Sequence, residues 1–450
     1  MASLSTTDVA AIQARYPDVF ARPFLKRFTG LLVAAGVAIY LIFAWWLFSA
    51  SAVLTNANWG IAGAYLADWV TYEVRPDIEI GADGLEVTLP RFSPIPDDYT
   101  PGWLKKDADS SGGLTAVTVE LGAAGSVHVE GATVTAVRGD ETIVFDLAEG
   151  SVTPRGELPA WAEQRRPGEK VLLAFGFPGN IEVRDDEVKV RRRFWGWANF
   201  LFDTNSPFWG KSAGEVTSLL FSGERIDPNR SNAAVAWNNI LNNSEWQHGD
   251  VWLKLLQTIV MAFVGTVLAT LVAFPLAFAA ARNITGNLLV NQVTKRFFDF
   301  LRSVDMLIWA LFFTRAFGPG PLAGISAIFF TDTGTFGKLY SETLENIDDK
   351  QREGIRSVGA SPTVVQRYGV LPQVLPVFLS QSLYFWESNT RSATIIGAVG
   401  AGGIGLKLWE AMRTNSDWEN VAYMVLLILL VVFVFDNISG FLRRRLMGRA

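Results

Sequence analysis

Glu387 and Arg391 are a charged pair four positions apart in a mostly apolar stretch of the chain. At that spacing the two side chains can meet on one face of a helix. Charges in apolar helices are costly, so they pair with one another or face a water-filled path. Arg391 can therefore help an anion to pass while Glu387 holds it in position, or the two can form a structural ion pair. The sequence leaves both interpretations open, and Arg302 and Asp305 have the same ambiguity.

A glycine-rich run, 397–405, follows this pair. Its glycines could form a close-packed gate, or their backbone N–H groups could line a path for an oxyanion. They could equally allow tight helix packing at a dimer seam. Trp309 and Trp386 are typical of interfacial anchors or packing residues rather than of substrate cages.

Several kinds of chemistry are excluded. There are no cysteines, and the two histidines, His128 and His248, lie too far apart to indicate a zinc site or a Ser/His/Asp set. Gly334 to Lys338 lacks the spacing of a phosphate-binding loop, and no lysine follows the 397–405 run at the required position. A net charge of −5 argues against nucleic acid. Enzymatic chemistry is not expected, so uphill transport would need an ion gradient or another subunit.

The composition indicates an integral membrane protein. The chain of 450 residues is 50% hydrophobic and 18% charged, whereas soluble domains carry about 25% charged residues. A membrane span needs about 20 predominantly apolar residues. Four apolar stretches meet this requirement, and two weaker stretches, interrupted by charges, are further candidate spans. The four clear stretches are 31–47, 255–281, 368–386 and 420–442, and the weaker two are about 296–316 and 317–342.

Basic flanks predict the orientation of these six spans. Arg22, Lys26 and Arg27 precede the first span, and an arginine cluster at 443–449 follows the last one. Positive residues favour the cytoplasmic side, so both termini are expected there. Six spans fit this result, and alternation then places about 343–367 in the cytoplasm. The first span is expected to be a retained anchor (29–50) after a cytoplasmic segment (1–28), and not a signal peptide.

A different kind of sequence lies between the first two spans. Residues 71–193 alternate apolar and polar positions between Gly and Asp turns, and acidic residues outnumber basic ones by 22 to 14. This pattern predicts an inserted β-rich domain, and the topology places it outside the cytoplasm. Its role is not readable, and a spacer or stability module is the simplest account. The following segment, 194–250, is interpreted as an interfacial linker in which Trp195, Trp197 and Trp209 lie on the membrane surface.

The cytoplasmic segment carries a family resemblance. Glu353, Gly359 and Leu371-Pro372 fall at the spacing of the EAA loop of ABC importer permeases, with Gly354-Ile355 in place of the two small residues and Gly369 in place of an apolar one. A short helix there must fit a cleft in an ATPase subunit and transmit its closure as a rigid body. Taken alone, the segment could also be an ordinary connector between two spans.

Further matches over about 250–450 extend the resemblance. Trp386 to Thr394 leading into the 397–405 run, Tyr368 to Gln373, and Asp436 to Ser439 are most similar to the phosphonate-importer permeases. Methionine-importer permeases share the glycine run. The chain departs from the family at Ser303 to Met306, where a Pro-Glu pair is usual, at Arg315, and in the long insert.

The resemblance implies a fold and a set of sites. The fold is an all-α polytopic membrane protein with a type I ABC importer permease core of five helices at 251–445, to which the first anchor adds a sixth helix, and with the β-rich insert. The residues implied in ATPase coupling are Glu353, Gly354, Gly359, Ala360, Ser361 and Pro362. Those implied in the translocation pathway or gate are Trp386, Glu387, Asn389, Arg391, Gly400, Gly402, Gly403 and Gly405. No catalytic or metal-binding residue is expected.

The implied function is a permease subunit in the bacterial inner membrane that imports phosphonate or a related phosphorus oxyanion. Two ATPase subunits would hold ATP and Mg²⁺, so this chain would bind no cofactor. A periplasmic phosphonate-binding protein and a second copy or a related permease chain complete the expected assembly. The alternatives are a permease for phosphite, phosphate, methionine or another small solute, and an ATP-independent secondary transporter or channel. In a further alternative the β insert is the working part and the spans are an anchor.

Overall fold

The computed structural model describes residues 28–57, 59–81, 84–90, 93–110, 113–414 and 418–446, together with the single residues 15 and 448. The chain divides into two compact units, 1–66 and 67–450, and each is described by itself. The expected cytoplasmic segment 1–28 lies almost wholly outside the described residues.

Helix α4 (Thr29–Leu47) dominates the described part of the first unit. It is long and apolar enough to cross a membrane. Ser49, in the left-handed conformation with φ 48°, separates α4 from the short helix α5 (Ala50–Asn56). Helix α6 (Trp59–Asp68) then runs across the boundary into the second unit.

Among the described residues, thirteen antiparallel strands form one sheet after α6, which confirms a β-rich region in the N-terminal half. The hydrogen-bonded order is β10-β11-β12-β13-β2-β3-β5-β6-β7-β8-β9, with β1 paired to β13 and β4 to β5. Gly139 and Asp140 form the two-residue turn that pairs Arg138 with Glu141. The strands are β1 (Thr71–Val74), β2 (Asp77–Gly81), β3 (Gly84–Thr88), β4 (Leu104–Ala108), β5 (Leu114–Glu120), β6 (Ser126–Glu130), β7 (Thr133–Arg138), β8 (Glu141–Ala148), β9 (Ser151–Pro154), β10 (Ala162–Gln164), β11 (Val171–Ala174), β12 (Gly179–Val183) and β13 (Glu187–Trp195).

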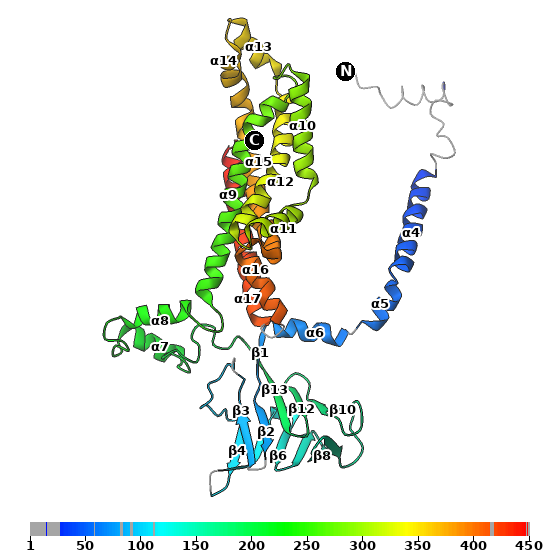
Figure 1. The fold of residues 1–450 in the computed structure, drawn as a ribbon, viewed down its shortest axis with the longest axis vertical. Helices are drawn as coiled ribbons and strands as arrows, with labels where there is room; N and C mark the ends of the chain where they lie inside the picture. Colours follow the sequence, from blue (N-terminus) through cyan, green and yellow to red (C-terminus); the bar gives the residue numbers. More distant parts are fainter. Residues whose placement is uncertain are drawn as a thin grey trace. The chain divides into compact units, whose positions relative to one another are not determined.

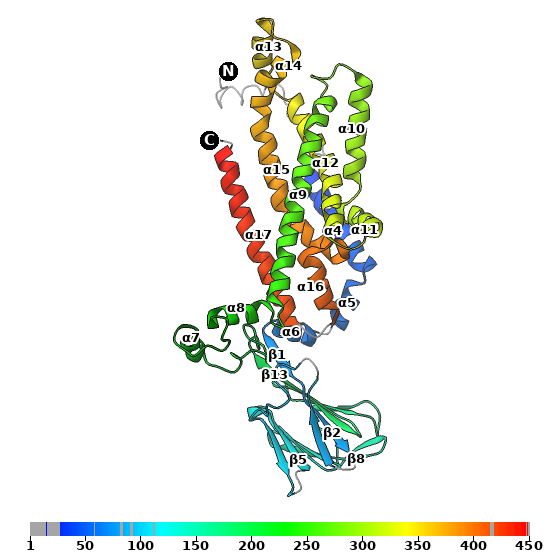
Figure 2. The ribbon, with the colours of Figure 1, turned by 60° about the vertical axis from the view of Figure 1, so that its left-hand side comes forward.

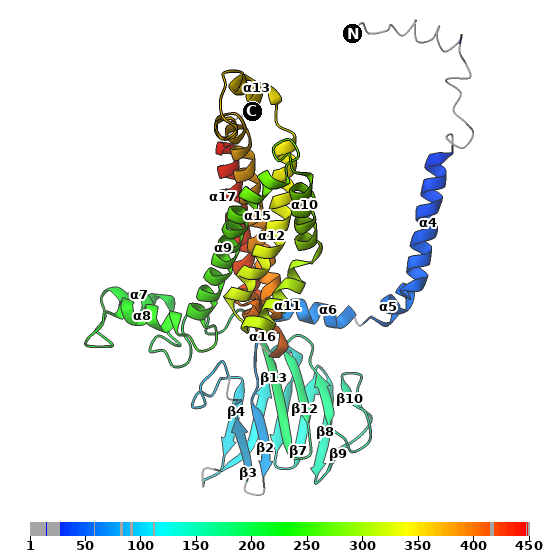
Figure 3. The same ribbon diagram turned by 45° about the horizontal axis from the view of Figure 1, so that its top comes forward.

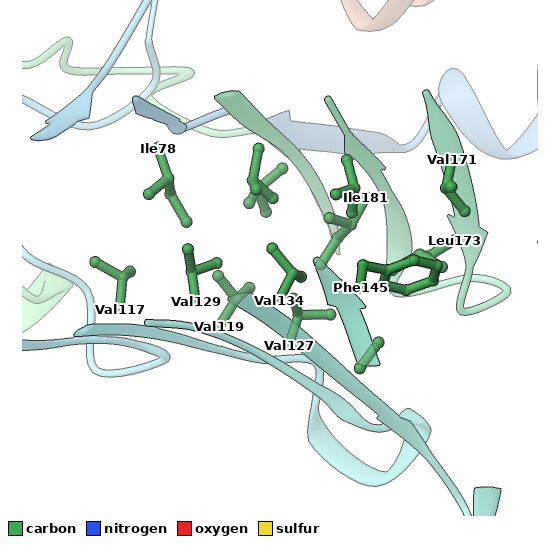
Figure 4. Close-up of a cluster of buried hydrophobic side chains, with 14 of the residues drawn as sticks. Ile78, Val117, Val119, Val127, Val129, Val134, Phe145, Val171, Leu173 and Ile181 are labelled. Carbon is green, nitrogen blue, oxygen red and sulfur yellow. The ribbon is translucent and has the colours of Figure 1, made fainter. Parts of the chain in front are cut away.

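The sheet folds over its own apolar face (Figure 3). Alternate residues point inward because successive side chains of a strand lie on opposite faces. Ile78 and Ile181 on one layer face Val117, Val129 and Phe145 on the other (Figure 4), and all five side chains are buried. A bridge between Val152 and Gly168 joins β9 to the turn before β11. The insert therefore has a hydrophobic core of its own.

Arg193, on the last strand, ties the start of the sheet to the end of α6. Its guanidinium lies 2.9 Å from carboxylate oxygens of both Asp68 and Glu73. Burial alone would raise the pKa of Glu73, but the neighbouring Arg75 and Arg193 outweigh burial and hold that pKa below its usual value. Burial raises the pKa of Asp68, and Arg193 offsets this effect only in part.

The helical part of the second unit begins with two short helices and continues with the core helices (Figures 1 and 2). Ser212 and Ser231 cap the two short helices by accepting backbone N–H groups, as is typical of helix starts. The helices are α7 (Ala213–Phe221), α8 (Asn232–Leu241), α9 (His248–Ala280), α10 (Leu288–Ser303), α11 (Met306–Phe317), α12 (Pro321–Glu345), α13 (Asp349–Ser357), α14 (Pro362–Val365), α15 (Leu371–Ile396), α16 (Gly403–Thr414) and α17 (Trp418–Leu446). Two π-helical turns, η2 (Gln366–Val370) and η3 (Gly397–Ala401), lie on either side of α15.

Small residues let α9, α10 and α12 approach closely, which is the usual basis of helix association in membranes. A Cβ added to Gly265 of α9 would lie 2.7 Å from Ile328 of α12. Gly334 and Gly337 of α12 face α10, where an added Cβ would meet Leu301 or the ring of Phe298. The buried small residues of α9 are Ala262, Gly265, Ala269, Ala273, Ala277 and Ala280. The glycines of the 334–338 stretch therefore belong to a helix-packing face.

The two weaker spans differ from the sequence-based expectation. The stretch 296–316 is not one helix, because Val304 is extended and Asp305 caps a new helix, α11, by accepting the N–H of Leu307. The stretch 317–342 corresponds to α12, which keeps Asp332 and Lys338 inside it. Among the described residues three helices, α4, α9 and α17, are long and apolar enough to span a membrane, and a pair bent by 59° around Gly402 makes up to four.

Aromatic residues join the end of the sheet to the helices. The indole N–H of Trp197 donates to the carbonyl of Trp69, and the ring packs against Phe200, Trp246 and Tyr423. Trp209 donates to Asn199, whereas Trp195 is 66% exposed. Of the three tryptophans expected on the membrane surface, Trp197 and Trp209 are thus held in contacts within the protein.

A relay of hydrogen bonds runs through this aromatic cluster. Trp252 Nε1 donates to the hydroxyl of Tyr423 at 2.8 Å, and that hydroxyl lies 2.7 Å from His248 Nδ1. His248 Nε2 is 2.6 Å from the carbonyl of Phe200, which can only accept. The neutral tautomer with hydrogen on Nε2 therefore satisfies every member, with Tyr423 donating to Nδ1.

Replacing Phe145 by Ala should weaken the β-rich insert selectively. Removing this buried ring is expected to cost about 3–5 kcal/mol in the free energy of unfolding, because the core cannot fully collapse around the cavity. Hydrogen exchange should then accelerate in the strands while the helices of 248–446 keep their protection. Leu172→Ala, an exposed position between two buried residues of β11, is the control and should change exchange little. Equal acceleration in the helices would contradict an independent core.

Tyr423→Phe should destabilise the junction between sheet and helices. It leaves Trp252 Nε1 and His248 Nδ1 without their common partner, which is expected to cost about 1–3 kcal/mol. Thermal unfolding in detergent measures this loss as a lower midpoint temperature. Tyr384→Phe is the matched control, because the Tyr384 hydroxyl makes no hydrogen bond within the described residues and its side chain is exposed. An unchanged midpoint in Tyr423→Phe would show that the relay does not contribute to stability.

Candidate coupling and translocation sites

Two short helices at one end of the core, α13 and α14, form an exposed joint (Figure 1). Asp348 caps α13 by accepting the N–H of Lys350, and Ser361 with Pro362 begins α14. Between them Gly359 has φ +79°, in the left-handed region that favours glycine. The chain therefore turns at Gly359, the position that the EAA-loop spacing, counted from Glu353, predicts.

The residues implied in coupling lie together on this joint. Glu353, Gly354, Gly359, Ser361 and Pro362 are exposed, and Ala360 is half-buried. Val358, directly before the turn, is 81% exposed.

Helix α13 is nevertheless fixed to the rest of the core. Arg352 binds Asp349 on its own helix at 2.7 Å and donates to the carbonyl of Asn283, between α9 and α10, at 3.1 Å. A Cβ added to Gly369 would come within 3.3 Å of the Ile355 side chain and 3.5 Å of the Arg352 backbone. This close approach explains why glycine occupies a position where the resembling family has an apolar residue.

The π-helical turn η2 leads from α14 into α15 without a loop. Pro372 stands in the first turn of α15 directly after the π-helical turn, so its missing N–H falls where the hydrogen-bond pattern of the helix already changes. Gln373 donates to the carbonyl of Gly369 at 2.6 Å and closes this junction. A displacement of α14 is therefore passed directly to α15.

Glu387 and Arg391 do meet on α15. Their side chains are 3.3 Å apart, and Glu387 is buried whereas the Arg391 side chain is 56% exposed. Glu387 also lies 3.6 Å from Arg443 of α17. The carboxylate is thus shared by two arginines, and the sequence reasoning did not include the second one.

Asn389 lies on the buried side of α15, away from the exposed Arg391. Its amide donates to Thr266 of α9 at 2.8 Å and to the carboxyl group of Asp332 on α12. All three side chains are buried. Asn389 therefore joins three helices, and its role in the structure is to hold them together. The sequence indicated its partner Asp332 only as a charge within a weak span.

The glycine-rich run forms a tightly packed corner between α15 and α16. An added Cβ would lie 1.9 Å from the Thr394 carbonyl at Gly405, and 2.3 Å from the Thr258 hydroxyl at Gly403. Gly400 and Gly402 have φ of +99° and +83°. The N–H of Ile404 donates to Thr258 at 2.9 Å and anchors the start of α16 to α9. The contacts of these glycines are those of close packing.

The other residues singled out in the sequence make local contacts. Arg302 pairs with Asp299 and not with Asp305, which caps α11. Trp309 stacks on Phe313. Trp386 packs against Phe263 of α9 and Phe435 of α17. Within the described ranges no group of three or more His, Asp or Glu side chains is arranged to hold a metal ion.

The sequence matches a known protein family and several known proteins over part of its length. Residues 273–448 match the family described as binding-protein-dependent transport system inner membrane component. The phosphite transport system permease protein PtxC of Stutzerimonas stutzeri is 39% identical over 194 residues, which cover 43% of this chain and 70% of that protein.

Two further relatives are also named as permease proteins for phosphorus-containing anions. The phosphate-import permease protein PhnE of Mycolicibacterium smegmatis is 33% identical over 197 residues, covering 44% of this chain and 37% of that protein. The putative cryptic phosphonate transport system permease protein PhnE2 of Escherichia coli K12 is 49% identical over 118 residues, covering 26% of this chain and 96% of that protein. With its exposed joint continuous with α15, the chain belongs to the family of binding-protein-dependent transport system inner membrane components, the permease subunits of ABC importers.

Proposed function

We propose that the chain is the permease subunit of an importer for phosphonate or a related phosphorus oxyanion, in the inner membrane of a bacterium. The relatives named for phosphite, phosphate and phosphonate share one chemistry, a small anion with several phosphorus-bound oxygens. The buried Glu387 with its two arginines fits such a cargo, since guanidinium groups bind phosphorus oxyanions through paired hydrogen bonds.

The observation that carries this proposal is the continuity from the exposed joint to the charged cluster. Helix α13, the turn at Gly359, α14 and η2 lead into α15, and Glu387 and Arg391 lie sixteen or more residues along that same helix. A helix of sixteen residues is about 24 Å long. A partner that moves α13 can therefore move α15 and its charges, which is the kind of motion that alternating access requires.

Two ATPase subunits, one for each permease chain, bind ATP and Mg²⁺ and dock at the joint. Glu353, Gly354, Gly359, Ala360, Ser361 and Pro362 are the proposed contact residues, supported by their position at the exposed end of the core. A periplasmic binding protein delivers the anion at the opposite end. A second copy or a related permease chain completes the path. This chain itself binds no cofactor and catalyses no reaction.

The proposed pathway follows α15 and the corner after it. Arg391 and Glu387 contact the anion or its counter-charge, and Trp386 and Asn389 hold α15 against its neighbours. Gly400, Gly402, Gly403 and Gly405 shape the corner at the end of the path. Their contacts support a packing contribution of each glycine within a gate formed by the whole corner.

The proposed topology has six spans, with both termini in the cytoplasm and the β-rich insert outside. The broken segment formed by the end of α10 with α11, and helix α12, complete the count, although both contain charges. Lys295 of α10 pairs with Glu345 of α12 at 2.7 Å, which supports their packing side by side at the cytoplasmic end. The basic run from Arg443 to Arg445 at the end of α17 agrees with this orientation.

Gly359→Asp should uncouple the permease from its ATPase. An aspartate at φ +79° strains the turn by about 1–2 kcal/mol and adds a charge at the docking surface. The chain is assembled with its ATPase and binding protein in lipid discs, and ATP hydrolysis is measured with phosphonates, phosphite, phosphate and methionine. We expect one phosphorus oxyanion to stimulate hydrolysis in the wild type and no stimulation in the variant.

Gly214→Ala is the matched control. Gly214 lies in α7, outside the joint, and an added Cβ there meets nothing within 4 Å. Stimulation should survive in this variant. Stimulation by methionine alone would keep the coupling role and reject the phosphorus oxyanion. Uptake without an ATPase, unaffected by Gly359→Asp, would favour a secondary transporter or channel, and uptake that stops when 71–193 is deleted would favour the insert as the working part.

A further inference from the structure

The carboxylate of Glu387 has two arginine partners on two different helices. Arg391 of α15 lies 3.3 Å from one oxygen, and Arg443 of α17 lies 3.6 Å from the other. Within the ranges that the structure describes, neither arginine has another acidic ion-pair partner. One negative charge therefore faces two positive charges, so the cluster carries a net charge of +1.

The two arginines retain hydrogen-bond donors that Glu387 does not use. Arg443 Nε is buried and has no hydrogen-bond partner among the described residues. A guanidinium has five N–H donors, and a single carboxylate cannot satisfy two such groups. The Arg443 guanidinium also lies 5.6 Å from the centre of the Tyr384 ring, within the range of a cation–π contact.

The exposed side of α15 shows where this cluster faces. Tyr384, Arg391 and Ile395 are exposed and lie on one face of this helix. Arg391 lies five residues before the end of α15, and its 56% exposed guanidinium would be too costly in the lipid interior. This face therefore borders a water-filled path or the second permease chain.

We propose that Arg443 and Arg391 together form an anion-binding site in which Glu387 is the resident counter-ion. An entering phosphorus oxyanion takes the place of Glu387 on Arg391, while Arg443 keeps Glu387 charge-balanced and donates Nε–H to the same anion. When the anion leaves, Arg391 returns to Glu387, so neither the Arg391 guanidinium nor the Glu387 carboxylate is left without a partner. This inference rests on the proposed function and adds Arg443 as a substrate-binding residue.

The exchange fits a phosphorus oxyanion better than a neutral or zwitterionic solute. Its several oxygens can accept from two guanidinium groups at once, and planar paired donation is what distinguishes arginine from lysine. Because Arg391 and Arg443 belong to different helices, an anion that binds both also holds α15 and α17 together. An amino acid carries its own ammonium group, which the net charge of +1 would repel.

The test measures coupling in proteoliposomes. Full-length permease, its ATPase and its binding protein are reconstituted, and uptake of labelled phosphate, phosphite and methylphosphonate is measured together with ATP hydrolysis. Loss of a charge-assisted hydrogen bond weakens an anion site by about tenfold or more. Arg443→Gln should therefore lower the number of anions transported per ATP by about tenfold, with no change in the concentration of binding protein that gives half-maximal rate.

Arg444→Gln is the matched control, since Arg444 is exposed in the same basic run and should transport as the wild type does. Arg443→Lys keeps the charge that balances Glu387 and should therefore assemble, while it loses the planar fork and should give an intermediate ratio. If Arg443→Gln does not assemble, an unchanged ratio in Arg443→Lys overturns the proposal. Transport by Arg443→Gln equal to that of Arg444→Gln also overturns it. Failure of the wild type to transport any of the three anions would instead reject the proposed function.

Discussion

The close approach of α9 to α12 is the constraint on which the rest of the helical core depends. It requires Gly265 against Ile328 and a row of alanines along α9, because larger side chains would separate the helices. This contact sets the position of Thr266 and Asp332, whose side chains receive the amide of Asn389 from α15. Helix α15 is therefore located by polar groups that are aligned only when the two helices behind it are tightly packed.

The sequence predicted the helices and strands whose patterns are continuous. The apolar stretches of α9 and α17 and the alternation of β7 and β8 each reflect a single environment along the element. It did not predict the break between α10 and α11, because a single N-cap, Asp305, ends one helix and begins the next inside an apolar stretch. Trp197 was assigned to the membrane surface because its partners Trp246 and Tyr423 are distant in sequence.

The candidate sites were predicted to the extent that they are local. Glu387 and Arg391 meet because four residues make about one helical turn, and Gly359 turns the chain as its spacing indicates. Arg443 was not included in the site, since its side chain reaches Glu387 only through the antiparallel packing of α15 and α17. Arg443 belongs to a basic run, and the cytoplasmic orientation of the last span was a sufficient explanation for that run.

The hydrogen bond from Arg352 to the carbonyl of Asn283 has a mechanical consequence. Helix α13 is connected to α15 through the chain and through Gly369, and to the turn between α9 and α10 through Arg352. A displacement of α13 is thus passed on through two connections. One is the chain itself, and the other is the hydrogen bond made by the Arg352 guanidinium. The relative stiffness of the two connections decides whether α15 tilts against α9 or both helices move together, so this partly buried hydrogen bond influences how motion of α13 is divided.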